Sequence, residues 1–252
     1  MVVGIEKFRE HFAGHEDQYA IIGGTACDLL FGAAGLDFRA TKDIDMVLCV
    51  EVVDAAFGNA FKAFLDAGEY EARERSDGAK EFYRFHRPKD PNFPFMIELF
   101  SRKPGTIELS EDTGFTPIPV EEDVVSLSAI LLDDGYYEAL QAAKRQVDGV
   151  TIIDESLLIP FKARAFLDLS ARLESGEKVD SKNIKKHRND VFRLVQLLPE
   201  GVAIEVSAPI RDDLRRFVEA AQADGTLDPK TFDVPFTRDE AVELLRSAYA
   251  LT

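Results

Sequence analysis

The stretch YAIIGGTACDLLFGAAGLDFRATKDIDMVL, Tyr19 to Leu48, contains the two motifs that decide the fold. The apolar run Ala20-Ile21-Ile22 leads directly into a Gly23-Gly24-Thr25 turn. Further along, an Asp43-Ile44-Asp45 triplet leads into the apolar run Met46-Val47-Leu48. Both motifs therefore fall where a predicted strand meets a loop.

Asp43 and Asp45 place two carboxylates on one predicted strand. Because side chains on a strand alternate between faces, both carboxylates point the same way and Ile44 points to the opposite side. Two such charges resist joint ionisation unless a cation lies between them, and Mg2+ takes oxygen ligands of this kind alongside substrate phosphates. The pair predicts a divalent-metal site, whereas an isolated Asp-x-Asp is more often two solvated residues at a strand end.

The Gly-Gly-Thr turn has the composition of a phosphate-binding segment. Glycine lacks a Cβ, so Gly23 and Gly24 let backbone N–H groups approach a phosphate closely. The helix predicted to follow adds the favourable dipole of its N-terminus. Glycines often simply make turns, and the signal becomes specific only in combination with the Asp pair.

Together the motifs resemble the signature of the DNA polymerase β-type nucleotidyltransferase superfamily, a hydrophobic-Gly-Gly/Ser turn followed by Asp-hydrophobic-Asp. The run Arg39 to Asp45, RATKDID, is similar to the Arg-x-Thr/Ser-x-Asp-hydrophobic-Asp run of the AbiEii-like toxin branch. The resemblance implies an α/β (α+β) fold in which a mixed sheet with flanking helices is followed by a helical C-terminal region. The predicted division is a nucleotidyltransferase-like domain over residues 1–150 and a helical domain over residues 151–252.

A third carboxylate is expected on a later strand. Glu98 lies within the otherwise apolar run Phe95 to Phe100, where a carboxylate is costly to bury unless it is paired or metal-bound. The superfamily most often has Asp at this place, so Glu98 departs from its pattern and Glu108 remains an alternative. The other interpretation of Glu98 is an edge-strand residue that faces water.

Basic residues of the predicted helical region are the remaining candidates. Lys162 interrupts an apolar helix and either extends to solvent or reaches a nucleotide phosphate. In the basic segment Ser181 to Leu194, Lys185, Lys186 and Arg193 lie off the apolar face, either as solvated charges or as contacts for a triphosphate or an RNA backbone. By the resemblance, Lys162 contacts the triphosphate, and Asp190 contacts Lys162 or the acceptor.

The resemblance further implies in-line attack of an acceptor hydroxyl on the α-phosphorus of an NTP, with two Mg2+ ions. Glu98 would complete the metal set or help to deprotonate the acceptor. The predicted catalytic residues are Asp43, Asp45, Glu98 and Lys162, and the predicted metal ligands are Asp43, Asp45 and Glu98. The predicted nucleotide-binding residues are Gly23, Gly24, Thr25, Lys42, Lys162 and Asp190.

The acceptor defines three alternatives. An AbiEii-like toxin would modify tRNA and would have an antitoxin protein as its partner. A small-molecule nucleotidyltransferase would transfer AMP to a hydroxylated molecule such as a cationic aminoglycoside, which suits the acidic composition. A non-catalytic module would retain the fold and nucleotide binding without turnover.

The composition of the chain limits the classes of protein to which it can belong. The chain has 252 residues, 46% of them hydrophobic, and a formal net charge of −16, which argues against a surface that is wholly a nucleic-acid footprint. Cys27 and Cys49 lack ligand spacing and are expected to be buried free thiols. No run approaches the roughly 20 apolar residues of a membrane span, so a cytoplasmic protein is expected.

Local patterns predict several further elements. Aromatic-rich runs at Glu81 to Arg87 and Phe95 to Ser101 favour a hairpin. A helix is expected from Tyr136 to Val147, followed by an Asp148-Gly149 turn and a helical pattern from Thr151.

Overall fold

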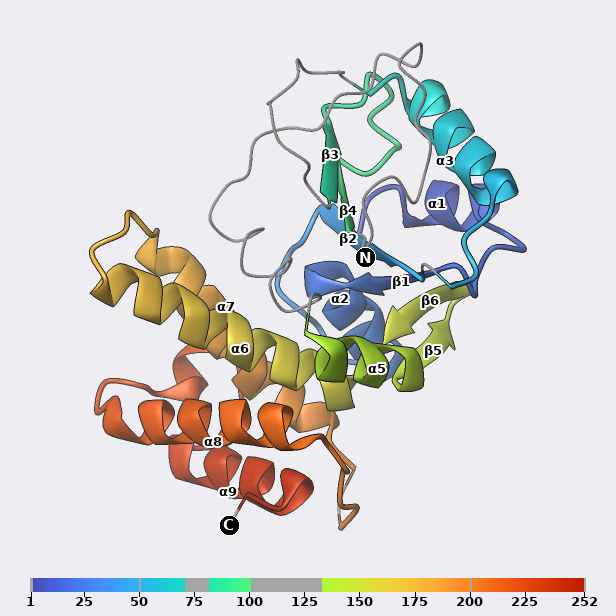
Figure 1. Cartoon of the computed structure of the whole chain (residues 1–252). Coiled ribbons are helices and arrows are strands. Elements are labelled where there is room, and N and C mark those ends of the chain that lie inside the picture. Colours follow the sequence, from blue (N-terminus) through green and yellow to red (C-terminus); the bar gives the residue numbers. More distant parts are fainter. Residues whose placement is uncertain (1, 50, 71–81, 101–132, 200, 252) are drawn as a thin grey trace. The chain divides into compact units, whose positions relative to one another are not determined.

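The computed structural model describes residues 2–49, 51–70, 82–100, 133–199 and 201–251, which form an α+β fold (Figure 1). The chain divides into two compact units. A sheet unit comprises Met1–Val120 with Lys144–Asp154, and a helical unit comprises Glu121–Ala143 with Glu155–Thr252. The predicted boundary at residue 150 lies within the last part of the sheet unit.

In the described part of the sheet unit, six strands form one mixed sheet in the order β3-β4-β2-β1-β6-β5. Strand β2 is parallel to β4 and β1 is parallel to β6, and the other neighbouring pairs are antiparallel. The β3/β4 pair is the hairpin that the aromatic runs predict. The strands are β1 (Tyr19–Ile22), β2 (Asp43–Leu48), β3 (Phe82–His86), β4 (Met96–Phe100), β5 (Lys144–Val147) and β6 (Val150–Ile153).

Two helices, α1 (Ile5–His11) and α3 (Ala55–Gly68), supply the aromatic core of this unit. The rings of Phe12 and Phe61 have centroids 6.0 Å apart, and the ring of Phe61 meets that of Phe85 on β3 edge to face at 5.4 Å. Phe85 pairs with Ile97, which pairs with Ile44, so the aromatic helices cover the Ile44 face of the sheet. The neighbours of Ile44 on β2, Asp43 and Asp45, therefore belong to the opposite face.

Strand β1 continues directly into α2 (Gly23–Ala33), which packs against β1 and β2. The contact between Gly23 and the Asp45 side chain places the beginning of α2 on the carboxylate face of the sheet. Both cysteines, Cys27 on α2 and Cys49 after β2, are buried free thiols, as the sequence predicts.

The predicted helix from Tyr136 to Val147 is wrong in its last part. Helix α5 (Asp134–Ala142) ends earlier, and Lys144–Val147 forms β5, which pairs antiparallel with β6. The predicted turn is confirmed: Asp148 and Gly149 have φ of 49° and 76°, as a tight hairpin requires. The helical pattern expected from Thr151 starts later, because Ile152 pairs with Ile21 and joins the hairpin to the sheet.

The helical unit has a long central helix, α6 (Glu155–Glu174), that packs against α7 (Ser181–Leu194) and α8 (Ala208–Ala223). Helix α9 (Arg238–Tyr249) packs against α8 and begins with the capping box of Thr237 and Glu240. Helix α5 belongs to this unit, where the hydroxyl of Tyr136 donates to Asp213 at 2.9 Å. In the described part of the chain, no helix is long and apolar enough to cross a membrane.

Candidate active site

Gly23 lies directly against the carboxylate of Asp45. A Cβ at Gly23 would lie 1.8 Å from Asp45 Oδ2, and Gly23 has a φ of +70°, in the left-handed region that favours glycine. Any side chain at this position would displace the Asp45 carboxylate. The fold therefore brings the two motifs, 22 positions apart in the sequence, into contact.

The Gly23-Gly24-Thr25 segment forms the first turn of α2, so its backbone N–H groups have no intrahelical hydrogen-bond partners. The N-cap residue, Ile22, makes no side-chain capping bond, and the first turn contains no acidic residue. The positive end of the helix dipole thus lies beside Asp45, which is an arrangement suited to an anion such as phosphate.

Thr25 has a different role from its neighbours. Its side chain is buried, and its hydroxyl donates to the backbone carbonyl of Asp43 at 2.5 Å. The hydroxyl therefore ties α2 to β2, and only the backbone of Thr25 belongs to the phosphate-binding turn that the sequence predicts.

The insert that precedes the Asp triplet returns to the glycine turn. A Cβ at Gly24 would lie 2.7 Å from Thr41 Oγ1 and 3.7 Å from Arg39 Nη2. The run Arg39 to Asp45 thus packs onto Gly24 at its start and onto Gly23 at its end. A side chain at Gly24 would therefore require Thr41 to shift, whereas Gly23 is restricted to glycine by both its φ and its contact with Asp45.

Glu98 lies beside Asp45 in the sheet. The two residues are partners in the parallel β2/β4 register, and Glu98 is 6% exposed. On its other side, Glu98 is paired with Arg84 of β3, whose Nε donates to Glu98 Oε1 at 2.6 Å while its Nη2 contacts the same oxygen. One row across three strands therefore carries Arg84, Glu98 and Asp45.

The electrostatics of this row follow from burial and charge. Burial, then the charge of Asp45 and a hydrogen bond with it, raises the pKa of Glu98 to about 8, against the opposing effect of Arg84. Glu98 and Asp45 thus share a proton at neutral pH in the absence of a cation.

The donors of this cluster fit Mg2+ by their chemistry. All are carboxylate oxygens, which hard cations prefer, and a cation would relieve the repulsion that raises the pKa of Glu98. Within the described ranges, however, no group of three or more His, Cys, Asp or Glu side chains is arranged to hold a metal ion. The fit thus rests on Asp43 and Asp45, since Arg84 already engages Glu98.

Lys162 and Asp190 meet inside the helical unit. Lys162 is 5% exposed, Asp190 is fully buried, and Lys162 Nζ lies 3.4 Å from Asp190 Oδ2. Arg193 Nη1 contacts the other oxygen of Asp190 at 3.2 Å, and its guanidinium lies over the ring of Phe232. Asp190 was expected to contact Lys162 or the acceptor, and it contacts Lys162. Arg193 is half-buried and paired with Asp190, whereas Lys185 and Lys186 are exposed.

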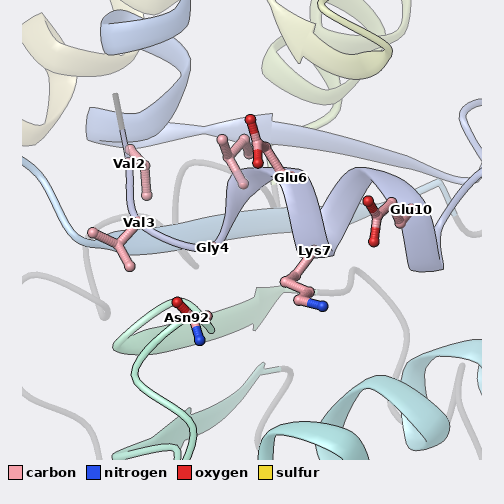
Figure 2. A pocket seen from close by; sticks show the side chains of 8 residues that line it. Val2, Val3, Gly4, Glu6, Lys7, Glu10 and Asn92 are labelled. Carbon is pink, nitrogen blue, oxygen red and sulfur yellow. The ribbon is translucent and has the colours of Figure 1, made fainter.

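Two pockets in the sheet unit lack every predicted site residue. One of about 430 Å3 is lined by residues 2–7, Glu10 and Asn92 (Figure 2). Another of about 350 Å3 is lined by Asp28, Leu29, Gly32, Ala33, Leu36, Asp37, Phe38 and Asp148.

The sequence predictions missed Arg84 and could not resolve Glu108. Glu108 lies outside the described residues, so Glu98 is the third carboxylate that the structure describes. Arg84 could have been identified from the sequence. The predicted hairpin pairs the strand that contains Arg84 with the strand that contains Glu98, and opposite charges on neighbouring strands stabilise such a pair.

Comparisons with known proteins add no family assignment. No protein-family model matches the chain. No curated protein matches it either.

Proposed function

We propose that this chain is a Mg2+-dependent nucleotidyltransferase that moves a nucleoside monophosphate from an NTP to an acceptor hydroxyl. The observation that carries the proposal is the contact of Gly23 with Asp45, which sets an uncapped helix N-terminus beside a carboxylate. A nucleotide with its cation needs this combination, because backbone N–H groups bind phosphate and carboxylates bind the metal. The resemblance to the DNA polymerase β-type superfamily supports the same conclusion.

The chain's own residues have separate parts in this proposal. The backbone of Gly23 and Gly24 would bind the phosphates, and Asp43 and Asp45 would hold Mg2+, which when bound neutralises charge at the reacting phosphate. Glu98, oriented by Arg84, is protonated in the absence of a cation; in its ionised form it would complete the metal set or accept the proton of the acceptor hydroxyl. Lys42 would contact the nucleotide.

The acceptor that we favour is tRNA, with the chain acting as an AbiEii-like toxin in the cytoplasm and an antitoxin protein as its partner. The proposal rests on the packing of the Arg39 to Asp45 run against the glycine turn, because this run carries the resemblance to that branch. Under this hypothesis, the resemblance assigns Lys162 to the triphosphate and Asp190 to a contact with Lys162, and Lys162 Nζ lies 3.4 Å from Asp190 Oδ2.

Two alternatives have observations of their own. The net charge of −16 favours a cationic small molecule, such as an aminoglycoside, as the acceptor. The ion pair between Arg84 and Glu98 favours a non-catalytic nucleotide-binding protein, because it withdraws one carboxylate from metal binding.

The test follows transfer of α-phosphate label from each of the four NTPs, with Mg2+, to total tRNA and separately to a panel of aminoglycosides. The chain is compared with Asp45→Asn and with the control Asp37→Asn, which alters an exposed aspartate in the insert before the site. Label on tRNA that is lost only in Asp45→Asn supports the tRNA hypothesis, and label on a drug supports the small-molecule hypothesis. Mg-NTP binding without transfer supports the non-catalytic hypothesis, and absence of both rejects the proposal.

A further inference from the structure

The insert between α2 and β2 places a guanidinium beside the glycine turn. A Cβ at Gly24 would lie 3.7 Å from Arg39 Nη2, which is ordinary van der Waals contact, so the side chain of Arg39 reaches the first turn of α2. Arg39 is half-buried, and it is not among the residues that the sequence predicted to bind the nucleotide. The turn therefore has a neighbouring cation that the predicted set of binding residues omits.

Two aromatic rings hold this guanidinium in place. Arg39 Cζ lies 5.1 Å from the centroid of the Phe38 ring, a cation–π contact. The ring of Phe38 packs in turn against Phe31 of α2, with 5.1 Å between the centroids, and Phe31 is fully buried. Arg39 is thus anchored to the same helix whose first turn it contacts, which lowers the entropic cost of ordering its side chain on a ligand.

The charge of Arg39 adds to the positive end of the α2 dipole. The first turn of α2 contains no acidic residue, and its N-cap residue makes no side-chain hydrogen bond. Cations are stabilised at the opposite end of a helix, so a guanidinium at this end is unfavourable without a neighbouring anion. The structure describes the Asp45 carboxylate against the turn, and in the proposed function this carboxylate binds Mg2+. The turn with Arg39 therefore favours a ligand that carries several negative charges.

The order of the contacts along the turn assigns Arg39 to one part of a nucleotide. Gly23 contacts Asp45, whereas the next residue, Gly24, contacts Arg39. In the proposed function the α-phosphate reacts at the cation on Asp45, so the β- and γ-phosphates extend along the backbone N–H groups toward Gly24. Arg39 lies at that end, where the fork of a guanidinium can contact two phosphate oxygens.

We propose that Arg39 binds the β- and γ-phosphates of the donor NTP and stabilises the pyrophosphate that leaves. The inference rests on the proposed function and deepens it, because it names a group that distinguishes a nucleoside triphosphate from a monophosphate. A purely structural Arg39 would only fasten the insert to α2 through Phe38 and Gly24. The two roles differ in whether the effect of removing the guanidinium depends on the number of phosphates on the ligand.

The test measures binding of labelled nucleoside tri-, di- and monophosphates of the four bases by equilibrium dialysis, with Mg2+ and without an acceptor. Arg39→Met should weaken triphosphate binding by about 10- to 100-fold, as expected for the loss of a hydrogen bond to a charged group, and should leave monophosphate binding unchanged. Arg39→Lys keeps the charge without the fork and should lie between the two. Phe38→Leu removes the ring under the guanidinium and should weaken triphosphate binding by about threefold.

The matched control is Arg145→Met, which removes an exposed arginine of the same unit on β5. Urea denaturation shows whether each variant folds, and if Arg39→Met does not, the ratio of tri- to monophosphate affinity in Arg39→Lys decides the question. Unchanged triphosphate binding by the folded variant overturns the proposal. An equal loss for tri- and monophosphates assigns Arg39 a structural role and also overturns it, as does failure of the unmodified chain to bind any triphosphate.

The same variants separate this inference from the proposed function. If label transfer depends on Asp45 while Arg39→Met binds and transfers as the unmodified chain does, the role of Arg39 is wrong and the enzyme assignment stands. If no label reaches any acceptor but triphosphate binding depends on Arg39, the role of Arg39 stands and the enzyme assignment is wrong.

Discussion

Replacement of Gly23 by alanine tests the contact on which the candidate site depends. The new Cβ would lie 1.8 Å from Asp45 Oδ2. Real contacts of this kind are not found below 3.0 Å, so the two atoms must separate by more than about 1 Å. Gly23→Ala should therefore displace the carboxylate and abolish label transfer, even though the substitution adds only one methyl group.

The effect on stability has two parts. Placing a Cβ at a left-handed φ of +70° costs about 1–2 kcal/mol. Overpacking against Asp45 adds about 1–3 kcal/mol. The free energy of unfolding should fall by about 2–5 kcal/mol in total, measured by urea denaturation followed by circular dichroism.

Gly35→Ala is the matched control for this experiment. Gly35 has a φ of +72°, and a Cβ there would meet nothing within 4 Å. This variant should lose only the conformational part, about 1–2 kcal/mol, and should keep full activity. Equal losses of stability for the two variants, together with normal transfer by Gly23→Ala, would refute the packing of Gly23 against Asp45.

Three further predictions concern single groups. Because the pKa of Glu98 rises from 4.5 to about 8 on folding, the folded state holds this proton more tightly than the unfolded state, so the free energy of unfolding in EDTA should decrease as pH rises from about 4.5 to about 8 and level off above that. Urea denaturation across this range should show a shallower decrease for Glu98→Gln, and an identical pH dependence would argue against the shift. Lys162→Met should lower the free energy of unfolding by about 3 kcal/mol, because it removes one of the cations that pair with the fully buried Asp190. A decrease below about 1 kcal/mol in the same assay would contradict the ion pair between Lys162 and Asp190. Thr25→Val should lower the free energy of unfolding by about 1–3 kcal/mol, because it removes the donor to the Asp43 carbonyl. Thr25→Ser keeps the hydroxyl and should retain most of that stability, so equal melting curves for the two variants would count against the hydrogen bond.

Local patterns predicted the strands around the site. The aromatic-rich runs predicted the β3/β4 hairpin, and the Asp148-Gly149 pair predicted the turn between β5 and β6, because both signals lie within a few neighbouring residues. The same local approach failed for residues 144–147. Lys144, Arg145 and Gln146 are good helix formers, but the pairing of β5 with β6, which itself pairs with β1, decides the outcome.

Some contacts of the carboxylate cluster could likewise be predicted from the sequence, and others could not. The motifs alone indicated that Gly23, Asp43 and Asp45 belong to one site, since a turn after a strand and an alternating acidic pair are visible in sequence. The engagement of Glu98 by Arg84 depends on the register of β3 against β4. A slip of one residue would send Arg84 to the other face of the sheet.

By itself the sequence determined which segments carry charge, glycine and apolar residues, and from these the buried thiols and the candidate carboxylates follow, whereas the α+β class was implied by the resemblance that the two motifs carry. The tertiary structure decided which of these groups touch: Gly23 with Asp45, Arg84 with Glu98, and Lys162 with Asp190. The physical reason is that local propensity acts over a few residues, whereas these contacts join positions 14 to 28 residues apart, where strand register and helix packing set the distances.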